Sequence, residues 1–256
     1  MKSKLMILGT GHLMGPLLKT LCQNYQVLAT TRSTQKKDFI NQCGAQHLTL
    51  DLPSQGPGQS LSDNLDFLII STPPLRHIEQ SLPTHVGKRV IFISSTSVYG
   101  SQGVCDEDSQ THPESENGKI LKETESKLRD MYPHRLTIIR PGGLIDHDRH
   151  PGKFLSARPI KDPWERIHLI HEDDVRSLIL EVLNHHSIAP DIINCINPSR
   201  ELKWDFYNHY TKKMGLPPVI LKEDLSSRPV HDHFKRDISS KYFEEFMGSF
   251  TFSKLD

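Results

Sequence analysis

A glycine-rich segment near the start of the chain has the residue types that bind phosphate groups. Gly9-Thr10-Gly11-His12-Leu13-Met14-Gly15 follows a short apolar run and precedes a helical pattern. Glycines let the backbone turn tightly and approach a pyrophosphate, and the N–H groups of the helix start then face that anion. The third glycine of the common G-x-G-x-x-G pattern would fall on Met14, and Gly15 comes one place late. We therefore predict that a dinucleotide is bound by Gly9, Gly11, His12, Leu13 and Met14.

The residues after the second apolar run bear on which dinucleotide binds. Thr30-Thr31-Arg32-Ser33 contains a guanidinium and hydroxyls but no carboxylate. A carboxylate there would accept hydrogen bonds from a ribose 2′-hydroxyl, whereas a guanidinium suits a 2′-phosphate. We predict that Thr31, Arg32 and Ser33 bind NADP(H) in preference to NAD(H); the alternative is that Arg32 only lies in solvent at a strand end. Asp51 is expected near the adenine, unless it is simply a turn former.

Apolar runs and helical periodicities alternate along the chain, and these elements would position the glycine turn. Runs of strand length cover residues 4–8, 27–30, 47–50, 67–70, 90–93, 136–139 and 192–194. Runs that are apolar on both faces are typical of parallel strands covered by helices. Apolar residues at helical spacing predict helices over 13–21, over 117–131, and from Asp173, as the N-cap, to Leu183. This alternation predicts an α/β fold with a Rossmann-type, doubly wound parallel sheet.

The chain is expected to divide into a sheet domain and a smaller lobe. Residues 1–145 and about 167–197 would form the NAD(P)-binding Rossmann domain. Residues of about 146–166, together with 198–256, would form a small C-terminal lobe, because the last segment is less regular and richer in charge, proline and aromatic residues. We expect this lobe to carry the determinants for a small-molecule substrate.

Composition narrows the classes of partner. The 256 residues include 31 Lys and Arg and 31 Asp and Glu, so no net field attracts nucleic acid as the main partner. The first apolar run is too short for a signal peptide or a membrane span. Four scattered cysteines without a C-x-x-C pair are typical of reduced thiols. These observations predict a cytoplasmic protein with no membrane partner.

Two further kinds of chemistry, metal binding by histidines and hydrolysis by a serine triad, can be checked against the sequence. Asp146-His147-Asp148-Arg149-His150 and His231-Asp232-His233 are the densest histidine groups, but neither has the spacing of a known metal motif. We expect solvated loop histidines and no metal. The chain also lacks a G-x-S-x-G elbow, so a hydrolase triad has no nucleophile.

Three further segments resemble the motifs of one known family. Ser94-Ser95-Thr96-Ser97-Val98-Tyr99-Gly100 resembles S-S-x-x-V-Y-G, Arg140-Pro141-Gly142-Gly143 resembles the R-x-x-x-x-Y-G-P region, and residues 168–175 resemble I-H-V-D-D-V/A. These are motifs of the extended short-chain dehydrogenases, the NAD-dependent epimerase/dehydratase family, and the resemblance covers nearly the whole chain. It implies a nicotinamide cofactor and hydride transfer between nicotinamide C4 and a substrate carbon.

The resemblance also implies roles for particular residues. Further cofactor contacts would come from Ser71, Thr72, Pro73, Ser94, Arg140 and Pro141. The segment 71–74 has an equally good alternative interpretation as a proline-stiffened turn. The family's substrate-positioning hydroxyl carries over to Ser95, with Thr96 beside it.

The family's Tyr-x-x-x-Lys pair, in which lysine lowers the pKa of the proton-transferring tyrosine, does not carry over. Alignment on Glu125 places Asn117 where the tyrosine belongs and Leu121 where the lysine belongs, and none of the six tyrosines has a lysine four residues later. The chain is similar to the atypical YeeZ-type branch, which shares the Pro-Leu after the glycine turn, T-S-V-Y-G and R-H-P-G-x-F (residues 149–154).

Two functions remain open from the sequence. The first is an NAD(P)-dependent oxidoreductase or epimerase/dehydratase acting on a small polar metabolite, nucleotide sugars included, in which Lys119, Lys122 or a water replaces the tyrosine. Asn117, at the tyrosine position, is a further candidate. The second is a non-catalytic NADP(H)-binding sensor or regulatory module. A homodimer is expected by analogy with the family.

Overall fold

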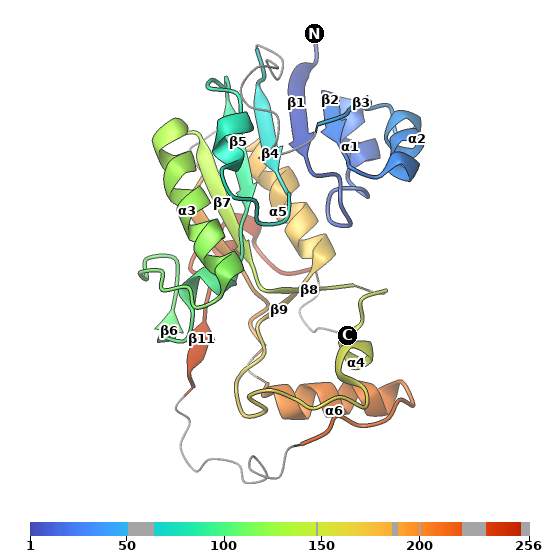
Figure 1. Cartoon of the computed structure of the whole chain (residues 1–256), viewed down its shortest axis with the longest axis vertical. Helices are drawn as coiled ribbons and strands as arrows, with labels where there is room; N and C mark the ends of the chain where they lie inside the picture. The colour runs from blue at the N-terminus through green and yellow to red at the C-terminus, as the bar shows by residue number, and fades with distance from the viewer. Residues whose placement is uncertain (51–63, 147, 186–188, 200, 222–233, 252–256) are drawn as a thin grey trace.

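The chain forms a parallel sheet with helices on both faces. A computed structural model describes residues 1–50, 64–146, 148–185, 189–199, 201–221 and 234–251, and Asp51 and the 231–233 segment lie outside these residues. The main sheet has seven strands in the order β10-β7-β5-β4-β1-β2-β3, and every neighbouring pair is parallel (Figure 1). The strands are β1 (Ser3–Leu8), β2 (Tyr25–Thr30), β3 (Gln46–Leu48), β4 (Phe67–Ile70), β5 (Arg89–Ile93), β7 (Leu136–Pro141) and β10 (Ile192–Cys195).

Apolar side chains alternate between the two faces of this sheet. Along β1, Leu5 and Ile7 belong to one buried cluster, whereas Met6 and Leu8 belong to another. Successive side chains of a strand point to opposite faces, so a strand that is apolar throughout needs cover on both. This physical demand confirms the predicted Rossmann-type, doubly wound sheet.

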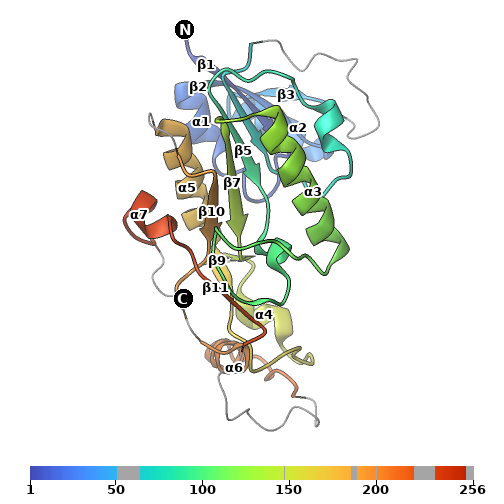
Figure 2. The ribbon, with the colours of Figure 1, turned by 90° about the vertical axis from the view of Figure 1, so that its left-hand side faces the viewer.

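Helices supply that cover on each face. On one side lie α1 (Leu18–Asn24), α5 (Glu172–Asn184) and α7 (Phe243–Met247), whose buried residues join the cluster of Leu5. The other side is covered by α3 (Glu116–Met131) and the short 3₁₀ helix η1 (Ile78–Ser81) (Figure 2). A further helix, α2 (Thr34–Gln42), follows β2.

A smaller lobe lies beyond the carboxyl ends of the strands (Figure 1). It contains α4 (Pro151–Leu155) and α6 (Lys203–Lys213). Its own apolar cluster is built from Ile145, Ile167, Leu169, Phe206 and Tyr210. Two small parallel ribbons lead into it: β8 (Gly143–Ile145) pairs with β9 (Leu169–His171), and β6 (Gly103–Cys105) pairs with β11 (Arg236–Ile238). In the described residues no helix has the length and apolar character that a membrane crossing requires.

Some boundaries differ from the predicted ones. The helix predicted from Leu13 begins at Leu18. Helix α5 is capped by His171, whose Nδ1 accepts the N–H of Asp173 at 3.1 Å, so the cap lies two residues before the predicted one. Phe243, in the segment assigned to the small lobe, is fully buried in the cluster on the main sheet. Part of the 198–256 segment therefore returns to the Rossmann domain.

Candidate functional site

The glycine turn after β1 requires glycine at its first position. Gly9 has φ of 91°, and a Cβ built on it would lie 2.5 Å from the carbonyl oxygen of Ser71. Ser71 follows β4 and donates its N–H to the carbonyl of Leu8 at 2.8 Å. The turn and the end of β4 are therefore in close contact at the point where the chain order reverses across the sheet, between β1 and β4. Ligands of doubly wound folds bind at such a point.

Strand β2 holds the turn from its other side. The N–H of Gly9 donates to Thr30 Oγ1 at 3.0 Å, and the N–H of Thr10 donates to the Thr30 carbonyl at 2.8 Å. Because the N–H groups of Gly9 and Thr10 are both bonded to Thr30, neither is available to a ligand. The role of Gly9 is therefore to allow the tight turn.

The free donors of the turn lie one step further along. Among the described residues no group accepts the backbone N–H of His12, Leu13 or Met14. The carbonyls of His12 and Leu13 accept from Arg176 Nη2 and Nε, at 3.3 and 3.0 Å. Pro16 has no N–H to donate to the His12 carbonyl, and the Leu13 carbonyl accepts from Arg176 instead of from a helix N–H. The first helical hydrogen bonds are therefore missing, which explains why α1 begins only at Leu18. The turn therefore has three successive N–H groups that have no acceptor among the described residues, although Leu13 and Met14 are themselves buried.

A cavity of about 280 Å³ lies beside this turn. Its walls come from the segments after β1, β2 and β4, and include the predicted residues Gly9, Gly11, Thr31, Arg32, Ser33, Ser71, Thr72 and Pro73. Thr10 and Thr30 complete the wall with Lys36, Leu50 and Leu75. Thr10 Oγ1 is buried and has no hydrogen-bond partner in the described structure. Buried hydroxyls are normally satisfied, so the lining residues fit a polar ligand such as the pyrophosphate and ribose of a dinucleotide.

The end of this cavity beyond β2 is cationic. Arg32 and Lys36 are both exposed and both line it, and no described carboxylate does. The Ser33 N–H donates to Thr31 Oγ1 at 3.2 Å, which holds the segment in place before α2 begins. Lys36 was not among the predicted residues. Lys36 lies three residues after Ser33 at the start of a helix, and residues with that spacing lie on the same helix face. This spacing could have predicted that Lys36 lies near Ser33.

Two of the predicted cofactor residues, Ser94 and Arg140, lie instead in a buried network under the sheet end. Arg140 Nε and Nη2 donate to the Glu125 carboxylate at 3.0 and 2.5 Å, and Ser94 Oγ donates to Glu125 at 2.6 Å. Arg140 is only 2% exposed and does not line the cavity. Pro141, next to it, is buried at the end of β7. These residues form a platform beneath the loop that carries Ser95.

The network continues through Tyr99. Arg140 Nη1 donates to the Tyr99 hydroxyl at 2.7 Å, and that hydroxyl donates to Asn194 Oδ1 at 2.9 Å. Burial raises the pKa of Tyr99. A raised pKa favours the neutral phenol, which makes Tyr99 a poor substitute for the tyrosine that the resemblance would require.

The predicted catalytic residues are divided between the loop and the surface of α3. Ser95 is half-buried and its Oγ accepts the Ser97 N–H at 3.1 Å, whereas Thr96 is buried. Asn117, Lys119 and Lys122 are exposed, and Lys122 Nζ donates to the Thr111 carbonyl at 2.7 Å. Within the described residues, no hydrogen bond joins Ser95 or Thr96 to any of these three side chains. Leu121, at the family's lysine position, is buried in the core.

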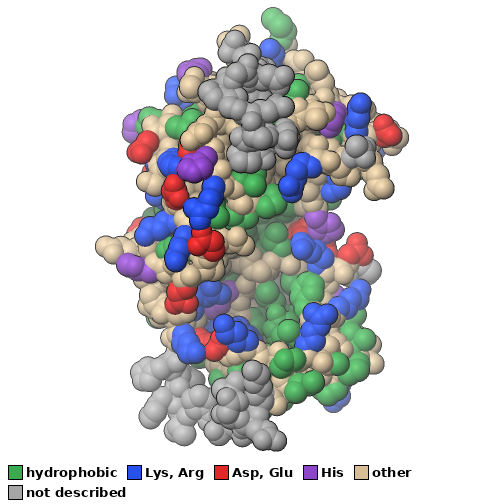
Figure 3. Space-filling view, in the orientation of Figure 1, with side chains coloured by type: hydrophobic (Ala, Val, Ile, Leu, Met, Phe, Trp, Pro, Cys, Tyr) green, Lys and Arg blue, Asp and Glu red, His purple; other side chains and the backbone are tan. Residues whose placement is uncertain are grey.

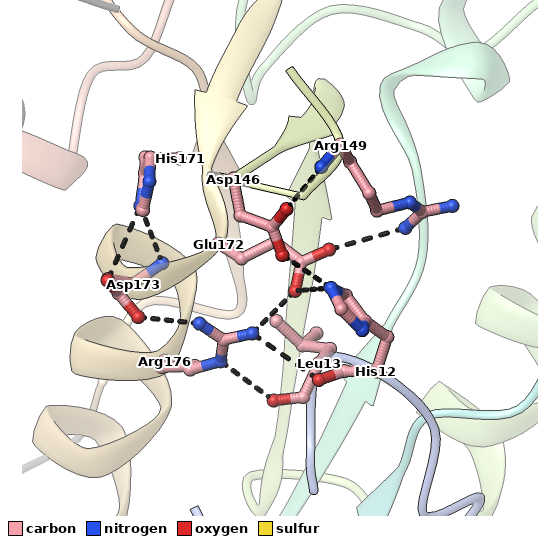
Figure 4. Close-up of polar contacts among 8 residues, drawn as sticks. All are labelled: His12, Leu13, Asp146, Arg149, His171, Glu172, Asp173 and Arg176. Atoms are coloured by element: carbon pink, nitrogen blue, oxygen red, sulfur yellow. Dashed lines mark hydrogen bonds and ion pairs between the residues drawn. The ribbon is translucent and has the colours of Figure 1, made fainter. Parts of the chain in front are cut away.

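The glycine turn is tied to the small lobe by an ion-pair cluster that the sequence did not reveal (Figure 4). Glu172, at the start of α5, is fully buried. Its carboxylate accepts from Arg176 Nη2 at 2.6 Å and from Arg149 Nη1 at 3.3 Å. Arg149 belongs to the R-H-P-G-x-F segment and donates its N–H to Asp146 Oδ1 at 2.6 Å. His12 Nε2 contacts Asp146 Oδ2 and lies 3.6 Å from Glu172 Oε2.

This cluster also contains the ligand types of a metal centre. One atom each of His12, Asp146 and Glu172 lie within 4.8 Å of one another. However, Arg149 and Arg176 already form ion pairs with the Glu172 carboxylate, so their positive charges balance the charge that a metal ion would otherwise neutralise. We therefore interpret the cluster as structural ion pairs. Of the histidines predicted to be solvated, His150 instead caps α4, because its Nδ1 accepts the Gly152 N–H at 3.2 Å.

A hollow separates the sheet from the small lobe on the face shown in Figure 3. Hydrophobic side chains gather on the small-lobe side of this hollow, and charged side chains stand around it. A parallel sheet with a glycine turn at its reversal point, a smaller lobe beyond the strand ends and a hollow between them define the class of two-lobed Rossmann proteins.

Comparison with known proteins places the chain within that class. No protein-family model matches it. YeeZ of Escherichia coli (strain K12) is 29% identical over 194 residues, which span 74% of this chain and 66%, just under two thirds, of YeeZ. The chain is thus a homologue of YeeZ. This relationship confirms the predicted resemblance to the YeeZ-type branch.

Solved structures show the same fold over nearly the whole chain. A functionally unknown conserved protein from Silicibacter pomeroyi DSS has a TM-score of 0.75 at 21% identity, covering 97% of this chain and 93% of that one. UDP-glucuronic acid 4-epimerase from Bacillus cereus, in complex with UDP-glucuronic acid and NAD, has a TM-score of 0.70 at 17% identity, covering 96% and 93%. The chain therefore shares its Rossmann-type fold with these proteins.

Proposed function

We propose that the chain is an NAD(P)-dependent oxidoreductase or epimerase/dehydratase acting on a small polar metabolite, nucleotide sugars included. One observation carries the cofactor part: in the turn after β1, the N–H groups of three successive residues, 12–14, and the adjacent buried hydroxyl of Thr10 have no partner among the described residues. A pyrophosphate has enough acceptor oxygens to satisfy these donors. Such donors at the sheet's reversal point favour a dinucleotide over a smaller ligand.

The cationic end of the cavity supports NADP(H) over NAD(H). Arg32 and Lys36 line the end of the cavity beyond β2, where we expect the ribose next to the adenine, and no described carboxylate lines the cavity to accept from a 2′-hydroxyl. A guanidinium and an ammonium both attract a 2′-phosphate. Asp51, the predicted adenine neighbour, stays a prediction.

The Bacillus cereus epimerase, which has the same fold, was solved in complex with UDP-glucuronic acid and NAD. This likeness supports a small-molecule substrate, for which the hollow between the sheet and the small lobe of this chain offers room. The bound nicotinamide would supply hydride exchange at its C4 atom. Ser95, on the loop above the Arg140 platform, would orient the substrate oxygen. Lys119, Lys122 or a water would deliver the proton, and Lys122 would first have to release the Thr111 carbonyl.

Turnover with purified protein tests this proposal. We expect oxidation of NADPH in the presence of at least one compound from a panel of UDP-sugars and small carbonyl metabolites. The Ser95→Ala variant should keep wild-type affinity for NADPH, since Ser95 lies outside the dinucleotide cavity, but lose most of the turnover. The proposal fails if NADPH does not bind at all.

A non-catalytic NADP(H)-binding module is the second candidate. The exposed, separated positions of Asn117, Lys119 and Lys122 favour it, as does a Tyr99 whose pKa is raised by burial. This candidate predicts cofactor binding that raises the melting temperature without chemistry. Stoichiometric NADPH should then stay reduced with every compound in the panel. Restoring the family pair would not discriminate, because Leu121→Lys would place an ammonium in the core.

A further inference from the structure

A second cavity, of about 300 Å³, lies where the 97–101 segment and the start of α3 meet the small lobe. It shares no lining residue with the dinucleotide cavity. Five cationic side chains line it, from the small lobe and from β11 and the residue before it: Lys161, Arg166, Lys203, Lys235 and Arg236. Three described carboxylates accompany them, so cations are in excess.

Two of these cations have no side-chain partner among the described residues, although both are partly buried. Lys203, at the start of α6, and Arg236, at the start of β11, are both only partly exposed. Neither side chain has a hydrogen bond or an ion pair within the described part of the chain. Burial lowers the pKa of both groups. Removing an unpaired charge from water is costly, so a protein that keeps two of them beside one cavity gains from an anion there.

The three carboxylates of this cavity are already engaged elsewhere. Asp162 accepts from Lys235 Nζ at 2.9 Å. Glu165 accepts the backbone N–H groups of Lys235 and Arg236 at 3.0 and 3.3 Å. Glu114, at the rim, accepts from Ser101. They weaken the positive field at Lys203 and Arg236, but within the described residues none of them forms an ion pair with either charged group.

The cavity borders the loop that carries the candidate catalytic serine. Ser97 lines the cavity, and its N–H is the donor that Ser95 Oγ accepts. Ser115, also in the wall, caps α3 by accepting the Gly118 N–H at 3.1 Å. An anion held by the small lobe would therefore lie against the same loop.

We propose that this cavity binds a phosphate or carboxylate group of a small molecule, with Lys203 and Arg236 as its ligands and Lys161 at its edge. A planar guanidinium and an ammonium together match the charge and the acceptor geometry of such an oxyanion. Taking this group to be part of the substrate rests on the proposed function. It restricts the substrate class to anionic metabolites. The binding of the anion itself does not depend on the proposed function.

Isothermal titration of the full chain with inorganic pyrophosphate and with malonate tests the site. Each titration is run with and without saturating NADPH. NADPH should block binding of the probe at the glycine turn, so binding that persists in its presence is assigned to this cavity. We expect Lys203→Met and Arg236→Met each to weaken the retained binding by about tenfold or more. The relative response of the two probes distinguishes a phosphate site from a carboxylate site.

Matched controls separate this inference from general charge effects and from the proposed function. Lys212→Met, on the exposed end of α6, and Arg135→Met, at an exposed position before β7, should bind both probes as the wild type does. Lys203→Met should melt at or above the wild-type temperature, because it removes an unpaired, desolvated charge. Equal binding by all four variants, or no binding of either probe, overturns the inference. Lost NADPH binding with intact Lys203-dependent anion binding would overturn only the proposed function.

Discussion

Replacing Gly9 by alanine perturbs the contact between the glycine turn and the end of β4. The φ of 91° puts an alanine in the left-handed region, at a cost of about 1–2 kcal/mol. Its Cβ would also lie 2.5 Å from the Ser71 oxygen and 2.8 Å from the Ser71 carbonyl carbon, both backbone atoms of the residue that directly follows β4. We expect a total destabilisation of about 3 kcal/mol, which is within the range for strained sites.

That loss should be visible by calorimetry as a fall in the melting temperature of roughly 6–12 °C for a chain of this size. A Gly9→Ala variant that melts like the wild type would refute the close approach of the turn to β4.

Gly11→Ala is the matched variant in the same turn. Gly11 does not have a positive φ, and no heavy atom lies within 4 Å of a Cβ built on it. We therefore expect a change in stability within about 0.5 kcal/mol. The added methyl would stand in the open space through which a pyrophosphate approaches the turn, so the affinity for NADPH should fall by about tenfold or more. If Gly11→Ala binds NADPH as tightly as the wild type, the pyrophosphate does not lie over this turn.

Three further changes test the cofactor choice, the buried network and the pH dependence. Arg32→Glu should weaken NADPH binding by about ten- to a hundredfold and leave NADH binding nearly unchanged; parallel losses for both cofactors would contradict the 2′-phosphate assignment. Arg140→Met removes the buried guanidinium that pairs with Glu125 and leaves that carboxylate with the Ser94 hydroxyl and, at 3.7 Å, Arg129 Nη2. It should lower the free energy of unfolding in urea by roughly 3 kcal/mol, and a loss below about 1 kcal/mol would show that the network is dispensable. The Lys4 N–H donates to Asp66 and lowers its pKa, so this bond stabilises the fold above the unfolded-state pKa of about 4 and is lost as the pH falls through the folded-state pKa. Asp66→Asn should flatten the acid limb of the stability–pH curve, and an unchanged limb would count against this assignment.

Local patterns were enough to predict the sheet. Short runs such as Phe67–Ile70 are apolar at every position, and only a strand covered on both faces buries all of them. The glycine turn followed from the same logic, since a strand and a helical pattern flank it. The absence of a Tyr-x-x-x-Lys pair is also a property of the sequence alone, because the spacing of two residues on one helix can be counted.

What stayed hidden depends on contacts between distant residues. Nothing near Arg140 indicated that Glu125 and Tyr99 would enclose it and remove it from the predicted cofactor contacts. Likewise, the helix start predicted at Leu13 was wrong because Arg176, 163 residues away from Leu13, takes the carbonyl that the helix needed.

The sequence by itself determined the period of each element, the position of the glycine turn and the lack of a Tyr-x-x-x-Lys pair. The tertiary structure decided which polar groups have partners. In the part of the chain that the structure describes, those without one include the Thr10 hydroxyl, the N–H groups of residues 12–14, and the charged groups of Lys203 and Arg236. The physical reason is that periodicity is set by backbone geometry within a few residues. Whether a donor or a charge has a partner depends instead on which distant segments fold against it.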